Sequence, residues 1–303
     1  MTCSVLICTY NRPELLLLSL QALLDRASEK PDQLVVVNGG DERADAVVAI
    51  FSDRYDVDIR LIKTVNHNLA TSRNIGLAHC TGDIIAMTDD DAEVFPDWLA
   101  CMRQVHREHP EAGAVGGPVL GTSTDQLVGK LADLITFPVW PAAQYVRTLP
   151  GVNISYKRTV IQQLGAQDEA LFRGEDVDYN WRVQKLGYKV YFDPAIKVYH
   201  HHRPTLRGFF HQHYMYGRAY YLVRHKWQDM YCVYPHGLHR LWDVVKAINF
   251  VAALFYQPIL NVCRLGRWRD RLIALPIFFI VGFLWKLGML IEMLFEYKES
   301  KAA

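Results

Sequence analysis

Three carboxylates stand in a row directly after an apolar run. Asp89, Asp90 and Asp91 follow the run at residues 84–87 and one threonine. Adjacent carboxylates repel one another unless a cation lies among them, and Mg²⁺ and Mn²⁺ bind carboxylate oxygens while sharing their coordination with phosphates. The triplet therefore predicts a divalent metal site that serves a phosphate compound; the alternative is a solvated acidic turn that caps the following helix. Alternation along a strand would put Asp89 and Asp91 on one face and Asp90 on the other.

A second acidic pair, Glu175 and Asp176, lies at the start of a predicted helix. The apolar face of this helix is predicted to include Val177 and Trp181, with Val183 as a further candidate. A carboxylate at a helix start can be a simple cap, which stabilises the helix and needs no catalytic role. The order of the parts favours more than a cap, because the acidic triplet, this pair and the later His200 could together hold a metal, a diphosphate and a general base.

The elements that must position these side chains alternate along the chain. Short β-branched and apolar runs, typical of buried strands, alternate with helical patterns, and this order predicts βαβ units, a mainly parallel sheet flanked by helices and an α/β fold. Ligands bind at the carboxyl ends of such strands, where polar clusters occur at residues 9–12, 38–41 and 89–91. The predicted strands span residues 4–8, 33–37, 58–63, 83–88 and 189–192, and the predicted helices begin at residue 13 and span 44–51 and 70–79.

The composition excludes several classes of protein. Hydrophobic residues make up 50% of the chain, and 33 Lys+Arg against 32 Asp+Glu leave a formal charge of +1, so a disordered or collagen-like chain is excluded and a nucleic-acid partner is not expected. The six cysteines, at 3, 8, 80, 101, 232 and 263, contain no C-x-x-C pair, which predicts reduced thiols in a protein that faces the cytosol. Residues 1–20 have no basic leader and are interrupted by polar residues, so a signal peptide is not expected there.

Four stretches, in this order, resemble the family 2 glycosyltransferases, which have the Rossmann-like GT-A fold and are inverting enzymes that use nucleotide-diphosphate sugars. A lone Asp-x-Asp would be a weak signal, whereas the ordered set is specific, and together with the segment 151–156 it covers residues 3–202. The four stretches are residues 5–13, residues 66–76, residues 88–93 with 96–99, and residues 174–178.

The resemblance implies a role for each carboxylate. Asp89 and Asp91 would form the Asp-x-Asp element that binds Mg²⁺ or Mn²⁺, with Asp91 as the direct metal ligand. Asp176 would be the base that deprotonates an acceptor hydroxyl as its oxygen attacks the anomeric carbon, and Glu175 would support it. His200 matches a position where relatives have a further metal ligand, and it is the predicted ligand among three adjacent histidines, of which alternate ones face opposite ways.

The resemblance also assigns residues to the nucleotide-sugar donor. At the end of the second strand the family usually has an aspartate that reads the uracil ring, whereas this chain has Asn38, which can accept a hydrogen bond from the ring N–H but lacks the charge. The expected donor is a UDP-sugar. For Arg73 the alternative is an ordinary helix salt bridge. The residues implied in donor binding are Thr9, Tyr10, Arg12, Asn38, Arg73, Asp89 and Asp90.

Two regions are predicted, a catalytic domain at 1–205 and a helical, aromatic-rich, membrane-associated region at 206–303. Two apolar segments, 241–263 and 272–295, approach the length of about 20 residues that a bilayer span needs. The four arginines between them would lie outside in a two-span hairpin, against the positive-inside tendency. The preferred interpretation therefore places both helices in the cytoplasmic interface, with the arginines on anionic headgroups. A two-span hairpin and a soluble helical appendix or dimer interface are the alternatives.

Attachment at the cytoplasmic face of a membrane would bring the enzyme to a lipid-linked or glycan acceptor. The predicted partners are therefore a nucleotide-diphosphate sugar, such an acceptor and membrane lipids, and a homo-oligomer is also compatible with the sequence. Phe137, Trp140 and Tyr145 either stack on the acceptor or pack against the sheet. Two other classes stay open: a catalytically silent sugar-nucleotide-binding scaffold, and a nucleotidyltransferase, which normally has a glycine-rich phosphate loop that residues 8–13 lack.

Overall fold

The structure is a computed structural model that describes residues 1–122, 126–202, 205–235 and 240–302. The chain divides into two compact units. The first unit carries the acidic residues singled out above, and the second carries the apolar helices. The first is formed by Met1–Thr122 and Phe137–His201, and the second by Ser123–Thr136 and His202–Ala303.

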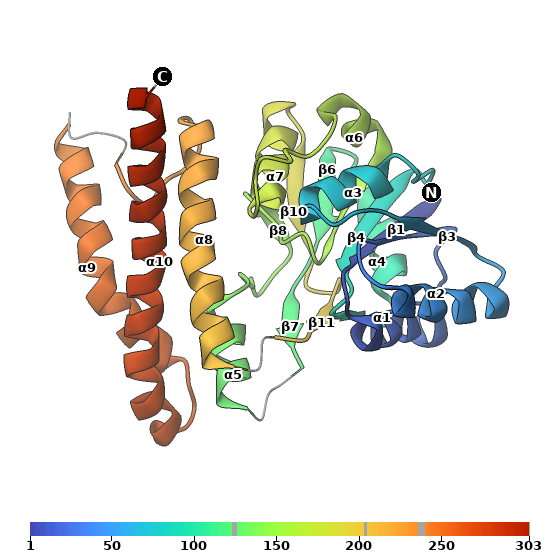
Figure 1. Ribbon diagram of the computed structural model, residues 1–303, viewed down its shortest axis with the longest axis horizontal. Coiled ribbons are helices and arrows are strands. Elements are labelled where there is room, and N and C mark those ends of the chain that lie inside the picture. Colours follow the sequence, from blue (N-terminus) through green and yellow to red (C-terminus); the bar gives the residue numbers. More distant parts are fainter. Residues whose placement is uncertain (123–125, 203–204, 236–239, 303) are drawn as a thin grey trace. The chain divides into compact units, whose positions relative to one another are not determined.

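In the first unit, strands and helices alternate as the sequence predicts (Figure 1). Every strand predicted from the sequence is present, and its ends lie within one residue of the predicted ends. Helix α1 is extended by a short π-helical segment, η1. In chain order the first elements are β1 (Cys3–Thr9), α1 (Pro13–Leu20), η1 (Gln21–Arg26), β2 (Gln33–Asn38), α2 (Glu42–Arg54), β3 (Asp58–Lys63), α3 (Leu69–Leu77), β4 (Ile84–Asp89), β5 (Ala92–Val94) and α4 (Trp98–Glu108). The later elements of this unit are β6 (Ala112–Gly116), β7 (Val119–Gly121), β8 (Gln144–Val146), β9 (Ile154–Lys157), α6 (Arg158–Leu164), α7 (Glu175–Lys185), β10 (Lys189–Phe192) and β11 (Val198–His200).

The main sheet brings the polar strand ends together. Among the described residues it has the strand order β3-β2-β1-β4-β9-β6-β10-β8. Strands β3, β2, β1 and β4 are parallel, with Thr9 opposite Asn38 and Cys8 opposite Asp89, so all three polar clusters lie at one edge. The sheet is mixed, because β9 is antiparallel to β4 and β6, and β8 is antiparallel to β10. A smaller sheet, β5-β11-β7, follows the acidic triplet.

Helices cover both faces of the main sheet, so its strands are buried on both sides. Helices α1, α2 and α4 contribute to one apolar cluster with alternate strand residues such as Val5 and Ile7. Helices α6 and α7 contribute to the other cluster with Leu6, and α3 packs on the same side. Burial on both faces is why the strands consist of nearly continuous apolar runs. The structure confirms the predicted α/β class.

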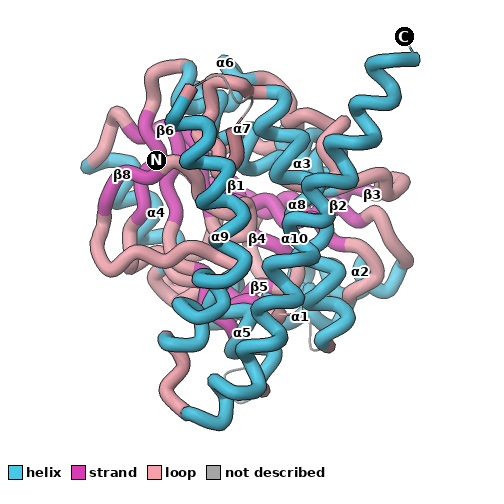
Figure 2. Tube along the Cα trace, turned by 90° about the vertical axis from the view of Figure 1, so that its left-hand side faces the viewer, coloured by secondary structure: helices cyan, strands magenta, loops and turns pink. Residues whose placement is uncertain are grey.

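The second unit consists of helices that pack against one another. Helix α5 lies inside the range that the sequence assigned to the catalytic region, but its Leu131 packs in one apolar cluster with Phe209 and Phe278. A Cβ at Gly217 would lie 1.8 Å from the carbonyl oxygen of Trp285, so only glycine permits this helix contact. Both views show α8, α9 and α10 running alongside one another (Figure 1, Figure 2). The helices are α5 (Leu127–Ile135), α8 (Leu206–Lys226), α9 (Leu241–Cys263) and α10 (Trp268–Ala302).

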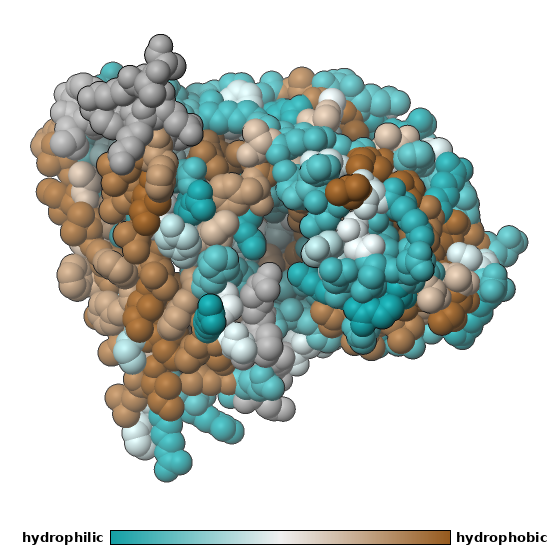
Figure 3. Space-filling view, viewed as in Figure 1, coloured by the Kyte–Doolittle hydropathy of each residue, from teal (hydrophilic) through white to brown (hydrophobic). Residues whose placement is uncertain are grey.

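Two helices of the second unit are long and apolar enough to cross a membrane. They are Leu241–Cys263 and the part Trp268–Phe295 of α10. Hydrophobic residues cover this part of the surface (Figure 3). The link between the helices is shorter than the sequence suggested, because α10 begins at Trp268 and Arg269 and Arg271 already belong to its first turn.

Candidate active site

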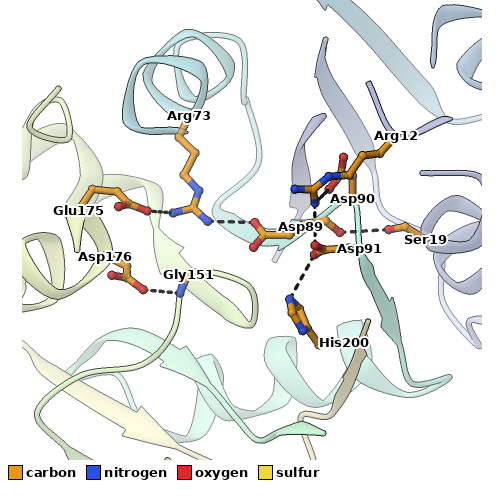
Figure 4. A network of polar contacts seen from close by, with 10 residues as sticks. All are labelled: Arg12, Ser19, Arg73, Asp89, Asp90, Asp91, Gly151, Glu175, Asp176 and His200. Atoms are coloured by element: carbon orange, nitrogen blue, oxygen red, sulfur yellow. Dashed lines mark hydrogen bonds and ion pairs between the residues drawn. The ribbon is translucent and has the colours of Figure 1, made fainter. Parts of the chain in front are cut away.

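Arg73 joins two carboxylates that lie far apart in the sequence. Its Nη1 donates to Oε1 of Glu175 over 2.8 Å, and its Nη2 donates to Oδ1 of Asp89 over 3.0 Å (Figure 4). The side chain is only 3% exposed, and although burial opposes the charge, the carboxylates raise the pKa of Arg73 above its usual range. This pairing is therefore not the ordinary salt bridge within one helix that was the alternative. It holds α3 to β4 and α7.

Arg12 binds the other two members of the acidic triplet. Its Nη1 donates to Asp90 over 3.1 Å and to Asp91 over 2.7 Å, and Thr9 Oγ1 donates to Asp90 over 2.8 Å. The predicted alternation of the triplet is wrong, because β4 ends at Asp89 and the next two residues form a turn that faces Arg12 with both carboxylates. Burial and the charge of Asp91 raise the pKa of Asp90 to about 7, against the lowering effect of Arg12.

His200 is the histidine that contacts the triplet. Strand β11 pairs antiparallel with β5, so His200 lies opposite Ala92, and its Nε2 is 3.3 Å from Oδ1 of Asp91. Although burial opposes it, the contact with Asp91 raises the pKa of His200. The other two histidines have different partners: His201 contacts Glu93, and His202 contacts Asp133. Among the residues that the structure describes, no three His, Cys, Asp or Glu side chains form a ready metal centre.

Asp176 is held by a backbone group from another part of the unit. Gly151 donates its N–H to Oδ2 of Asp176 over 2.9 Å, and the backbone N–H of Val177 donates to Oδ1 over 2.8 Å. Gly174 precedes the helix with φ 81°, a conformation that favours glycine and turns the chain into α7. The carboxylate of Asp176 is thereby fixed at the start of α7, beside Glu175.

Glu175 lies in a buried setting between Arg73 and Asp176. Burial and the charge of Asp176 raise its pKa to about 7, and the bridge to Arg73 works in the opposite direction. Its side chain is 8% exposed. The structure therefore places Glu175 as the partner of Arg73.

The buried face of α7 agrees with the predicted one only at Val183. Val177 and Trp181 are only partly buried, whereas Tyr179 and Val183 are fully buried against the sheet. The apolar positions in the sequence are compatible with either stripe, and packing selects the one that also carries the buried Asn180, whose Nδ2 donates to the carbonyl of Leu149 over 2.9 Å.

Asn38 has its amide occupied by its own loop and by the start of α2. Its Nδ2 donates to the carbonyl of Asp41 over 2.8 Å and to Asp45 over 2.7 Å, and its Oδ1 accepts the N–H of Gly40 over 2.8 Å. Asn11, with φ 54°, accepts the N–H of Asp41 and ties this loop to the end of β1. The amide of Asn38 therefore shapes the loop, and Tyr10 beside it is 50% exposed.

The loop aromatics pack against the protein. The ring of Trp140 lies 5.0 Å from that of Phe192, and Tyr145 lies 5.2 Å from Tyr191. Phe137 makes an edge contact with His200, with ring centroids 5.3 Å apart.

The structure thus gathers most of the predicted site residues at the strand ends of one sheet. Arg73 and Arg12 are the two cations among them, and each neutralises two carboxylates. One positioning residue, Gly151, was not predicted for the site; its signal was the glycine that opens the segment 151–156 just ahead of β9. The gathered residues are Thr9, Arg12, Arg73, Asp89, Asp90, Asp91, Gly151, Glu175, Asp176 and His200.

The fold is that of solved glycosyltransferases. A mannosyltransferase from Pyrobaculum calidifontis, in complex with GDP-Man and Mn²⁺, superimposes with a TM-score of 0.62 at 17% identity, over 94% of this chain and 86% of that one. A structure of GalNAc-T7 with UDP, GalNAc and Mn²⁺ gives a TM-score of 0.54 over 67% of this chain and 43% of that one, at 15% identity. These likenesses confirm the expected GT-A fold.

Sequence comparison gives the family. The profile described as glycosyl transferase family 2 matches residues 4–145, and the profile described as glycosyl transferase family group 2 matches residues 84–295. The chain belongs to these family 2 glycosyltransferases.

Two relatives indicate the range of the family. A glucosyl-dolichyl phosphate glucuronosyltransferase from Haloferax volcanii is 32% identical over 55% of this chain, which spans 56% of that relative's length. The succinoglycan biosynthesis protein ExoM from Rhizobium meliloti is 27% identical over 80% of this chain and 79% of its own length.

Proposed function

We propose that this protein is an inverting glycosyltransferase that moves a sugar from a nucleotide-diphosphate sugar to a lipid-linked or polysaccharide acceptor at the cytoplasmic face of a membrane. The observation that carries the proposal is the joint placement of Asp91, His200 and Asp176 at one end of the sheet, on either side of the Arg73 bridge. Family membership supports the reaction class.

A divalent cation, Mg²⁺ or Mn²⁺, fits the residues present. The Asp91 oxygen and the His200 nitrogen face each other at 3.3 Å, and carboxylate and imidazole are both ligands of Mn²⁺. These two side chains would hold the ion, and phosphate oxygens of the donor and water would complete its coordination. Asp89 would be a further ligand of the ion through the carboxylate oxygen that Arg73 does not bind. When bound, the cation would neutralise charge on the departing diphosphate.

Asp176 is the proposed base. Each of its oxygens accepts one backbone N–H, which orients the carboxylate and leaves lone pairs free for the proton of an acceptor hydroxyl. The acceptor oxygen forms a bond to the anomeric carbon, the bond from that carbon to the diphosphate breaks, and the proton passes to Asp176. In-line attack inverts the anomeric centre. Glu175 supports the reaction by holding Arg73 near the site.

The donor would bind over the ends of β1 and β2. Arg12 and Arg73 would contact a diphosphate in competition with the carboxylates that they already bind, and Tyr10 offers an exposed ring at the end of β1. Asp90, which accepts a hydrogen bond from Thr9, holds Arg12 in place. A UDP-sugar is the proposed donor, with Asn38 shaping the base-side loop through its own hydrogen bonds.

The apolar helices support the proposed location. Two helices have the length and composition of membrane spans, and one relative acts on a dolichyl phosphate compound while another belongs to succinoglycan biosynthesis. Helices that span the bilayer and helices that lie in its interface both keep the enzyme at the membrane where a lipid-linked acceptor would be found.

Release of nucleotide from UDP-, GDP- and dTDP-sugars tests the proposal. The purified full chain is assayed with Mn²⁺, with Mg²⁺ and with chelator, beside the variant Asp176→Asn. We expect one donor to be cleaved only with a metal and only by the unchanged protein. Binding of a donor without cleavage, even after lipid extract is added as acceptor, would instead support a silent sugar-nucleotide-binding scaffold.

A further inference from the structure

The second unit contains a cavity among its helices that has no part in the proposed catalytic site. Its volume is about 350 Å³, within the range of small-molecule sites. Side chains from α8, α9 and α10 and from the end of α5 line it, and most of its wall is apolar. The lining residues are Ile135, Thr136, His213, Tyr216, Ala253, Gln257, Pro258, Asn261, Phe278, Val281, Gly282, Trp285 and Lys286.

Two residues of this lining each carry a buried side-chain polar atom that lacks a hydrogen-bond partner among the described residues. These atoms are Oγ1 of Thr136 and Nε2 of His213. His213 is only 5% exposed, and burial lowers its pKa to about 4, so its imidazole is neutral at pH 7 and can present an N–H. Buried polar atoms are normally satisfied, and leaving one unpaired is costly. A bound ligand with hydrogen-bond acceptors would satisfy both.

The charge of the lining is positive. Lys286 makes no ion pair with any described residue; its ammonium lies 4.3 Å from the centroid of the Phe250 ring. No residue of the lining is acidic. A carboxylate elsewhere in the unit, Glu292, is already paired with Arg218 over 2.6 Å. The cavity therefore offers one unmatched positive charge together with the donors of Thr136 and His213.

The apolar part of the wall continues onto an apolar surface. Phe278, Val281 and Pro258 line the cavity, and the neighbouring Phe283 and Ile259 are exposed on α10 and α9. A chain that leaves the cavity would meet hydrocarbon side chains and, in the proposed setting, the lipid around them. An anionic head and an aliphatic chain are therefore both accommodated.

We propose that this cavity binds an amphiphile with a phosphate head and an aliphatic chain, with the phosphate at Lys286, His213 and Thr136. A phosphate suits these residues because it carries charge opposite to Lys286 and its several oxygens can each accept a hydrogen bond, whereas a carbonyl offers one neutral oxygen. The proposal shares the membrane setting with the proposed function but needs neither donor nor metal, so it can be tested separately from transfer.

The test uses the detergent-purified full chain without nucleotide or divalent metal. Binding of three probes is measured by native mass spectrometry and by the shift in thermal unfolding: farnesyl phosphate, farnesol and inorganic phosphate. We expect farnesyl phosphate to bind, and we expect the affinities of farnesol and inorganic phosphate to be lower by about tenfold at least. Equal binding of inorganic phosphate would identify a free-phosphate site, and equal binding of farnesol an apolar one; either result would overturn the proposal.

Variants separate the cavity from the rest of the helical surface. Lys286→Gln removes the charge and shortens the side chain by one atom, and we expect it to weaken farnesyl phosphate binding about tenfold. Lys246→Gln, on α9 but outside the lining, is the matched control and should bind as the unchanged protein does. Equal binding by Lys286→Gln and Lys246→Gln would contradict the assignment.

Gly282→Leu provides a second, independent test. A Cβ at Gly282 would meet only Leu254, at 3.9 Å, so the first carbon of a side chain has room there, and leucine favours the helix more than glycine does. The larger side chain should occupy part of the cavity and reduce binding while thermal stability without ligand stays equal or rises. Unchanged binding in a folded Gly282→Leu protein would refute the proposal. The variant Asp176→Asn, which is expected to lose transfer, should bind farnesyl phosphate normally.

Discussion

The backbone N–H of Gly151 donates to Oδ2 of Asp176 over 2.9 Å, and this hydrogen bond joins two segments that are 25 residues apart. Gly151 also lies against Arg73: a Cβ at this glycine would lie 2.6 Å from Nη1 and 2.7 Å from Nη2 of the guanidinium. The absence of a side chain thus serves both the proposed base and the bridging arginine. A carboxylate and a cation that the mechanism needs are positioned by one glycine.

Gly151→Ala should therefore impair transfer. The new methyl group must displace the Arg73 guanidinium or move the backbone away from Asp176, and small displacements of catalytic groups can reduce rates by about 10²-fold. We expect kcat to fall by about tenfold or more. Nucleotide release with saturating donor measures this.

Gly266→Ala is the matched control for that substitution, because a Cβ there meets no atom within 4 Å. It should retain normal activity. Normal turnover by a folded Gly151→Ala protein would show that the contact with Asp176 has no bearing on catalysis.

Asp176→Asn should abolish transfer and preserve donor binding. The amide keeps the shape of the side chain but cannot take a proton, and loss of a general base typically costs about 10²–10⁴-fold in rate. Steady-state transfer and calorimetric binding of the donor are measured side by side. The exposed Asp56→Asn is the control for a lost surface charge. If Asp176→Asn instead loses donor binding, the residue belongs to the donor site and is not the base.

Asp91→Asn should weaken the metal-dependent binding of nucleotide. Asp91 faces His200 across 3.3 Å, and the substitution removes a charged ligand from that pair. Binding of UDP is measured by calorimetry with Mn²⁺ and with chelator for both proteins. We expect the gain in affinity on adding Mn²⁺ to shrink about tenfold or more. A gain equal to that of the unchanged protein would exclude Asp91 as a ligand.

His106 predicts a pH dependence of stability that is unrelated to catalysis. It is buried in α4, its Nε2 lies 2.9 Å from Oγ of Ser155, and burial lowers its pKa to about 3. Because the unfolded chain takes up a proton near pH 6.5 and the folded one does not, stability is complete above pH 6.5 and falls as the pH drops toward 3. Between pH 6.5 and 5 this residue should cost about 2 kcal/mol.

Thermal unfolding at pH 7.5, 6 and 5 tests the effect, with His106→Gln as comparison. Glutamine can also bond to Ser155 but does not titrate, so the unfolding temperature of the variant should decline less between pH 7.5 and 5. Parallel declines in the two proteins would show that His106 is not the group responsible.

Much of this architecture can be predicted from local patterns. The apolar runs that form β1 to β4, and the carboxylates that end β4, are visible in the sequence because strand burial and strand ends leave a short-range signal. The parallel arrangement then follows from the alternation of strands and helices, which is why the meeting of Thr9, Asn38 and Asp89 at one edge could be expected.

Other features depend on contacts that no local pattern contains. Which of three adjacent histidines meets Asp91 is decided by the register of β11 against β5, and the stripe of α7 that is buried is decided by packing on the sheet. Arg73 and Glu175 are 102 residues apart in the sequence, and their hydrogen bond forms only when the folded sheet brings α3 and α7 together. The sequence by itself determined the types of groups and their order along the chain; only the tertiary structure decided their partners, because hydrogen bonds and charge pairing act over a few ångströms between segments that the fold brings together.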